Sequence, residues 1–167
     1  MPTPSVYYSS DGHRLTIYNA TQEFMDTLEY THIPSEITIH GDYIPNLRVP
    51  EGVQRVHCED CGVRNLTLPS SIITLICNEN YIAHITVPAT IEHVNLQGNL
   101  LETFTVEGGH ARALQTLDLQ RNRIAHLDFE VDPNRLTYFD LRLNTVESFD
   151  IVMSKTLNEA WDLWGSS

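Results

Sequence analysis

Apolar residues recur along most of the chain in one fixed pattern. From Leu114 onward they occupy positions 1, 4, 6, 11, 14 and 16 of a template, and Asn122 fills position 9. Copies of this template start at residues 34, 53, 72, 91, 114 and 136, which are 19, 19, 19, 23 and 22 residues apart. A degenerate copy is visible at Leu15 and Ile17. The chain is therefore built from an internal repeat.

Each copy predicts one short strand. Positions 3 to 7 alternate between outward polar and inward apolar residues, which is the strand period. The next copy adds a parallel strand about 4.8 Å away, so six or seven copies predict a curved sheet. In three copies a proline follows position 16, at Pro50, Pro69 and Pro88. Proline fixes φ and removes a backbone donor, which favours an irregular, turn-like back face.

The pattern L-x-x-L-x-L-x-x-(N/C)-x-L resembles that of the leucine-rich repeat (LRR) family. The resemblance implies an α/β solenoid: a curved stack with a parallel concave β-sheet, a short irregular back face and helical end caps. It also implies that the side chain at position 9 hydrogen-bonds to backbone groups of its turn and of the neighbouring repeat. The residues at this position are Asp42, Cys61, Asn80, Asn99, Asn122 and Asn144.

The repeat boundaries predict a single LRR domain over residues 1–167. Residues 1–33 form the N-terminal cap with the degenerate repeat, 34–152 the six repeats, and 153–167 a C-terminal helical cap. Because solenoids need capped ends, we expect a helix over about 22–30 that begins at Asn19 or Thr21. A second helix would carry Leu157, Trp161 and Trp164 on one face, as a lid over the last repeat or as an aromatic docking surface.

Composition and charge narrow the choice of partner. The 167 residues include 22 acidic and 10 basic ones, for a formal net charge of −12. This charge disfavours nucleic acid and anionic membranes as partners. The sequence has no long apolar run and no basic leader, so we expect a soluble monomer in the cytoplasm. The short Leu-Pro-like repeats loosely resemble those of bacterial effector proteins, so for a delivered effector or a viral protein this would be the host cytosol.

Candidate chemistry is sparse. Cys58 and Cys61 have the spacing of zinc ligands, but the template turns Cys58 and Cys77 inward, where free cysteine serves as a small hydrophobe. We therefore expect no metal, no cofactor and no disulfide. The sequence offers no nucleophile with a base and an orienting residue, which predicts that the protein is not an enzyme. The alternative is a hydrolase that uses His57, Glu59 and Asp60, with or without a metal.

The concave face of the sheet is the predicted binding surface. Template positions 3, 5, 7 and 8 should face solvent there, and LRR proteins commonly bind protein ligands on this face. Tyr and Arg are frequent interface anchors, and apolar residues on a wet face are unusual. On these grounds the predicted partner-binding residues are Tyr18, Arg55, His57, Ile76, Arg121, Tyr138, Arg142 and Leu143. The sequence thus predicts a protein–protein interaction module, with a self-assembling structural module as a further alternative.

Overall fold

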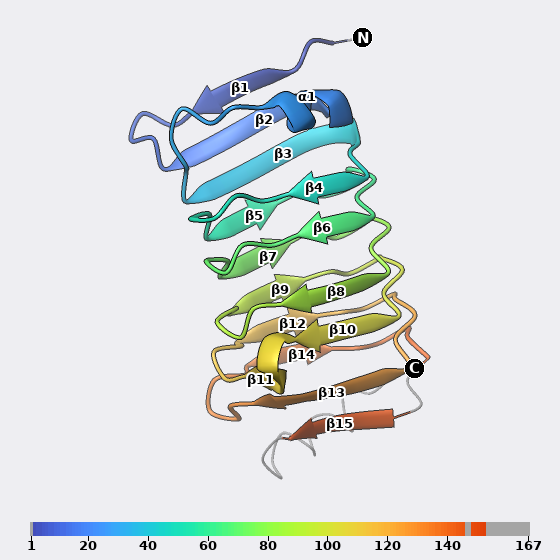
Figure 1. Cartoon of the computed structure of the whole chain (residues 1–167). Coiled ribbons are helices and arrows are strands. Elements are labelled where there is room, and N and C mark those ends of the chain that lie inside the picture. The colour runs from blue at the N-terminus through green and yellow to red at the C-terminus, as the bar shows by residue number, and fades with distance from the viewer. Residues whose placement is uncertain (1, 146–147, 153–167) are drawn as a thin grey trace.

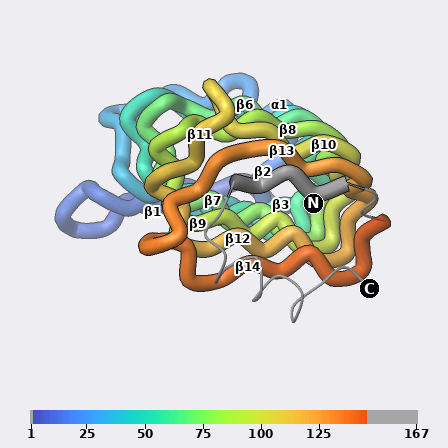
Figure 2. Tube along the Cα trace, turned by 90° about the horizontal axis from the view of Figure 1, so that it is seen from below, coloured from blue at the N-terminus to red at the C-terminus, as the bar shows by residue number. Residues whose placement is uncertain are grey.

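The chain winds into a parallel β-solenoid of about seven turns (Figure 1). The computed structural model describes residues 2–145 and 148–152. Within these residues almost all regular structure is strand, and the predicted repeat solenoid is confirmed. Figure 2 shows successive turns stacked on one another around a shared interior.

One wall of the solenoid is an eight-stranded sheet, here called the principal sheet. Its spatial order is β1, β2, β3, β5, β7, β9, β12, β14, and every pair except β1 with β2 is parallel. The strands are β1 (Ser5–Tyr8), β2 (Arg14–Thr21), β3 (Glu36–Tyr43), β5 (Arg55–His57), β7 (Thr74–Ile76), β9 (His93–Asn95), β12 (Thr116–Asp118) and β14 (Tyr138–Asp140).

The pairing register of the principal sheet follows the repeat template. Arg55 pairs with Thr74, Thr74 with His93, and His93 with Thr116. Thr116 in turn pairs with Tyr138. All of these residues hold position 3 of their copies. Each template position therefore forms a row of side chains that crosses the sheet from turn to turn.

The back face of the solenoid is more regular than predicted, because short parallel strands cover it. They are β4 (Asn46–Arg48) with β6 (Asn65–Thr67), β8 (His84–Val87) with β10 (Thr103–Val106), and β13 (His126–Val131) with β11 (His110–Ala111) and β15 (Ser148–Val152).

The proline column explains why the prediction of an irregular back face was wrong. In β8, Ile85 and Val87 are buried and Thr86 is exposed, which is the alternation of a half-buried strand. Pro88 comes after the strand has ended, and its carbonyl accepts from the Ile91 amide at 3.2 Å. The proline thus turns the chain and leaves the strand ladder intact. Residues 107–110 belong to the copy that is 23 residues long, and they include a 3₁₀ turn, η1 (Glu107–Gly109).

Asparagine side chains tie neighbouring turns together inside the solenoid. Asn80 Nδ2 donates to the carbonyl of Cys58 at 2.7 Å, one turn back, and to that of Cys77 at 3.1 Å. Its Oδ1 accepts from the amides of Cys61 and Val63, both at 3.0 Å. The same two-turn bonding recurs at the other buried asparagines, Asn99, Asn122 and Asn144.

The first two members of this column differ. Cys61 is buried and its one S–H has two carbonyls within reach, those of Glu59 at 3.2 Å and Ile39 at 3.5 Å, so it reproduces part of the asparagine bonding. Asp42, in contrast, is exposed and does not take the buried position that the template assigned to it. The reason is local: β3 continues to Tyr43, and a register irregularity occurs where Ala20 meets Gly41. The chain therefore stays extended where later repeats turn.

The N-terminal end is capped by a strand as well as a helix, which corrects the predicted helical cap. Strand β1 pairs antiparallel with β2 and covers the edge of the principal sheet. The helix α1 (Gln22–Thr27) is shorter than predicted and begins at Thr21, whose hydroxyl accepts from the Phe24 amide. The hairpin signal was Asp11-Gly12 between two alternating runs. The predicted C-terminal helix over 153–167 lies outside the described residues.

Candidate functional site

The outer face of the principal sheet contains a hollow of about 340 Å³, here called the sheet hollow. It extends over five strands, from β5 to β14, or about 19 Å at the usual spacing. Most of its lining comes from the outward rows of the repeat, and the buried residues Leu75 and Val94 also contribute. The lining residues are Arg55, Thr74, Leu75, Ile76, His93, Val94, Asn95, Thr116, Asp118 and Tyr138.

The predicted binding residues divide into two groups. Arg55, Ile76 and Tyr138 line the sheet hollow together. The rest lie outside its lining, namely Tyr18, His57, Arg121, Arg142 and Leu143. Two residues predicted to face solvent, Thr74 and Asp140, are buried. Both side chains are short, and on a sheet the longer side chains of neighbouring strands lie close enough to cover them.

A polar network borders the hollow at its C-terminal end. The Arg142 guanidinium donates to both oxygens of Asp140, at 3.0 and 2.6 Å, and to Gln120 Oε1 at 3.3 Å. Gln120 Nε2 in turn donates to Asp118 at 3.2 Å. Tyr138 donates its hydroxyl to Asp140 at 3.3 Å. Arg142 is thus already engaged within the chain, so it positions its neighbours rather than offering a free cation.

The two carboxylates of this network have opposite pKa shifts. Burial raises the pKa of Asp118, and the hydrogen bonds from Gln120 only partly oppose it. Burial would also raise the pKa of Asp140, but the hydrogen bonds and charge of Arg142 hold it below its ordinary value. Asp118 therefore offers the hollow a partly buried hydrogen-bond acceptor. The charge of the neighbouring Asp140 is compensated by Arg142.

Arg121 and Leu143 occupy the turns that follow the strands. Their φ angles are 52° and 60°, in the left-handed region that non-glycine residues rarely adopt. Four further members of position 8 share this conformation, Asn19 in the degenerate copy and Asp60, Glu79 and Gly98 in later ones. These positions are fixed by the turn geometry, and Arg121 is already ion-paired with Glu79. Because the charge of Arg121 is already paired within the chain, it does not support the prediction that this residue binds a partner.

Aromatic side chains cluster at the N-terminal end of the principal sheet. The rings of Tyr18 and His40 stack with centroids 4.9 Å apart and planes 9° apart. Tyr7, on β1, meets Tyr18 edge-on at 5.8 Å. The sequence prediction selected Tyr18 but missed Tyr7, because it placed no strand before the degenerate copy at Leu15 and Ile17. The run of β-favouring residues Val6, Tyr7 and Tyr8 was the signal for β1.

Of the three residues of the hydrolase alternative, His57 and Glu59 lie close to each other. His57 Nε2 lies 3.7 Å from Glu59 Oε2, and both side chains are well exposed. Asp60 lies in the left-handed turn beyond. Among residues 2–145 and 148–152, no group of three or more His, Cys, Asp or Glu side chains has a geometry that could hold a metal ion.

The three cysteines are free and fully buried against one another. A hydrogen bond from Cys61 would lower the pKa of Cys58, but Cys77 and burial raise it overall. The pKa of the Cys61 thiol is raised strongly by its contact with Cys58 and by burial. The raised pKa disfavours the thiolate of Cys58 and of Cys61, which is the form that acts as nucleophile and as metal ligand.

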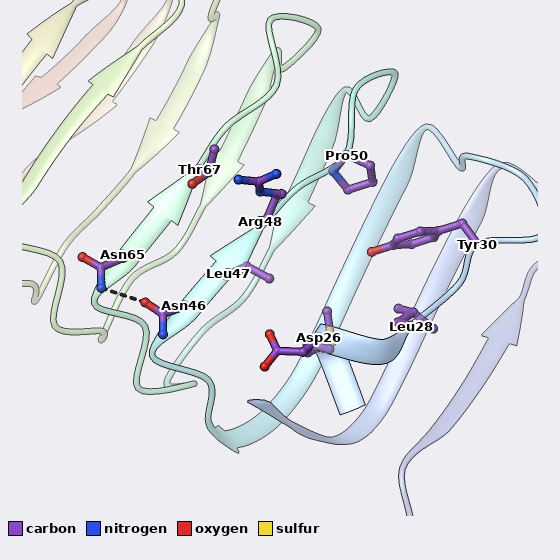
Figure 3. A pocket seen from close by; sticks show the side chains of 10 residues that line it. Asp26, Leu28, Tyr30, Asn46, Leu47, Arg48, Pro50, Asn65 and Thr67 are labelled. Carbon is purple, nitrogen blue, oxygen red and sulfur yellow. Dashed lines mark hydrogen bonds between the residues drawn. The ribbon is translucent and has the colours of Figure 1, made fainter. Parts of the chain in front are cut away.

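A second hollow, of about 440 Å³, lies on the back face and was not predicted (Figure 3). Met25, Leu28 and Tyr30 form one side, and the back strands β4 and β6 form the other. It exists because α1 ends at Thr27 and the chain then runs extended, so the cap does not close over these strands. Asn65 Nδ2 donates to Asn46 Oδ1 at 2.8 Å, and Gln22 binds the Asn46 backbone. This hollow is a seam between the cap and the first back strands.

Comparisons with known proteins give this chain no relatives: no protein-family model, no curated protein and no solved structure matches it. Within the described residues no helix has the length and apolar character needed to cross a membrane.

Proposed function

We propose that this protein is a protein-binding module and that a segment of a partner protein occupies the sheet hollow. The observation that carries the proposal is the hollow itself, which brings Arg55, Ile76 and Tyr138 to one surface from β5, β7 and β14. Arginine and tyrosine are the residue types that dominate binding energy at interfaces. A lining that combines one guanidinium, one carboxylate and an apolar centre suits a mixed peptide surface.

We further propose that the chain is a divergent leucine-rich repeat protein. The repeat pattern and the two-turn hydrogen bonds of Asn80, Asn99, Asn122 and Asn144 support this assignment. The back face departs from this family's expected pattern, because it is made of short strands and not of irregular segments. Three buried free cysteines are consistent with a reducing compartment, so we propose the cytoplasm, or a host cytosol for an effector-like or viral protein.

Binding, rather than catalysis, is the activity that we propose. The most polar cluster on the principal sheet is the network of Arg142, Asp140 and Gln120, whose groups satisfy one another. Satisfied networks rigidify a surface, which favours recognition with little ordering cost. A rigid solenoid wall of this kind presents a preformed face to its partner.

The test compares two triple variants that change the same residue types. The first, Arg55→Glu, Ile76→Ser and Tyr138→Ala, alters the sheet hollow. The second, Arg123→Glu, Ile33→Ser and Tyr81→Ala, alters exposed residues elsewhere. A partner is first isolated from the native cell type with the unaltered protein, and its affinity for each variant is then measured.

We expect the first triple to lose at least a hundredfold in affinity and the second to stay within about threefold, since hot-spot residues each contribute about 2 kcal/mol or more. Equal affinities for the two variants would refute the sheet hollow as the binding site. Light scattering over a range of concentrations adds a second readout. Assembly of the chain with itself, abolished by the first triple, would assign the hollow to a second copy instead.

A further inference from the structure

A third, smaller hollow lies at the ends of β2 and β3, where the principal sheet meets its rim. Its volume is about 280 Å³, and we call it the rim hollow. It is lined by Pro2, Asn19, Ala20, Thr21, His40, Gly41, Asp42 and Tyr43. It shares no lining residue with the sheet hollow, which begins at β5. The two surfaces can therefore be tested separately.

The charge of the rim hollow is negative. Asp42 is the one acidic or basic side chain in its lining besides the imidazole of His40. In the described part of the chain, no arginine or lysine lies within ion-pair distance of Asp42, whose side chain is exposed. The whole chain carries a net charge of −12, which adds to the attraction of a cation.

Aromatic rings supply the remainder of the surface. Tyr43 is 58% exposed. Its ring lies against the next turn at Gly62, where an added Cβ would come within 3.0 Å of Tyr43 Cδ2. His40 is held by stacking on Tyr18. The two rings are therefore fixed by their neighbours and do not have to be ordered when a ligand arrives.

The repeat shows what such a rim tyrosine binds. Tyr81, which holds the same template position as Tyr43 two turns later, has the Arg64 guanidinium over its ring, 5.2 Å from the centroid. Arg64 lies in the turn before Tyr81 and directly follows Val63, whose carbonyl accepts from the Tyr81 amide at 2.8 Å. In the turn before Tyr43, Thr21 pairs with Tyr43, and Gln22 and Glu23 follow it. The chain thus supplies a guanidinium to Tyr81, whereas the residues at the corresponding place before Tyr43 are not basic.

We propose that the rim hollow binds the side chain of an arginine from a partner protein. The guanidinium would stack on Tyr43 and donate hydrogen bonds to the Asp42 carboxylate. Planar guanidinium suits both contacts, because it stacks on aromatic faces and binds a carboxylate through two N–H groups. This contact is additional to the sheet hollow and does not depend on it.

The test uses small ligands and residue-resolved NMR. The ¹⁵N-labelled protein is titrated with N-acetyl-arginine amide, with its neutral isostere N-acetyl-citrulline amide, and with N-acetyl-lysine amide. We expect saturable shifts of the Asn19, Gly41, Asp42 and Tyr43 amides with the arginine compound. The citrulline compound should bind at least tenfold more weakly, and the lysine compound should bind less tightly than arginine because it cannot form the two-pronged contact.

Four variants localise the contact. Asp42→Asn should weaken binding of the arginine compound about five- to tenfold, and Tyr43→Leu about two- to fivefold, the range of a cation–π contact at an exposed site. The controls Asp128→Asn and Tyr81→Leu should leave binding unchanged. Equal binding of citrulline and arginine, absence of saturable shifts, or shifts confined to the sheet hollow would each overturn the proposal. Tighter binding of lysine than of arginine would overturn the guanidinium assignment.

Discussion

Glu79 and Arg121 form an ion pair that passes over an intervening turn of the solenoid. The two residues lie 42 positions apart, and Gly98 occupies the corresponding position of the turn between them. A Cβ added at Gly98 would lie 2.6 Å from Glu79 Oε1. The Glu79 carboxylate thus occupies the space that a side chain at this position would take. Sequence reasoning selected Arg121 as a binding residue, and the structure shows that its charge is already matched.

Gly98→Ala should destabilise the protein by about 1–2 kcal/mol. Gly98 has a φ of 69°, which an L-residue with a Cβ adopts at a cost, and the new methyl group displaces the Glu79 carboxylate. Urea unfolding measures the loss. The same substitution in a Glu79→Ala background should cost less, because only the φ penalty remains. An identical cost in both backgrounds would contradict the close approach of the two residues.

Asn99→Ala should destabilise the protein by about 1–3 kcal/mol. Its amide donates to the carbonyls of Cys77 and Leu96, and its Oδ1 accepts from Ile82, so the substitution leaves buried backbone groups without partners. The matched control is Asp42→Ala, in the same template column but exposed, which should change stability by less than about 0.5 kcal/mol. The midpoints of chemical unfolding compare the two. Similar losses would mean that the column has no special role.

Leu143→Asn should stabilise the protein by about 1 kcal/mol. Leu143 is 57% exposed and has a φ of 60°, and asparagine tolerates this conformation better than a branched apolar residue does. Thermal unfolding measures the gain. A decrease in stability would show that Leu143 packs against the chain in a way that its exposure does not reveal.

Arg142→Ala should destabilise the protein more at neutral pH than in acid. Because Arg142 holds the pKa of Asp140 below its ordinary value of about 3.9, Asp140 contributes stability above that pH. The contribution is lost as the pH falls through the lowered pKa. The variant and the unaltered protein should therefore differ in stability at pH 7, and the difference should shrink as the pH falls below the ordinary pKa of an aspartate. Arg123→Ala serves as the control, and a difference that does not shrink in acid would contradict the linkage.

The repeat made much of the fold predictable. The template predicts the register of the principal sheet, because position 3 of each copy pairs with position 3 of the next, even where the copies start 22 or 23 residues apart. The asparagine column was predictable for the same reason, since a buried amide needs the same turn in each copy. Asp42 was the exception, because β3 runs past the point where later repeats turn.

The back face and the N-terminal cap were harder to predict. The prolines Pro50, Pro69 and Pro88 suggested irregular structure. Each of them comes after a back strand has ended, so none interrupts a strand. Strand β1 was missed because it has no copy in the repeat. The shape of the sheet hollow depends on which outward side chains are buried and which are exposed. Thr74 and Asp140 are buried, so template position alone does not decide the exposure of a side chain. The rim hollow depends on Gly62 in the next turn, which the sequence does not connect with Tyr43.

The most direct test of the sheet hollow as the binding site is site-specific photocrosslinking with the purified partner. A photoreactive amino acid replaces Ile76, which lines the hollow, or Asp128, which is exposed on β13 of the back face. If the partner binds in the hollow, it crosslinks efficiently from position 76 and not from position 128. Crosslinking from position 128 with none from position 76 would contradict the proposal.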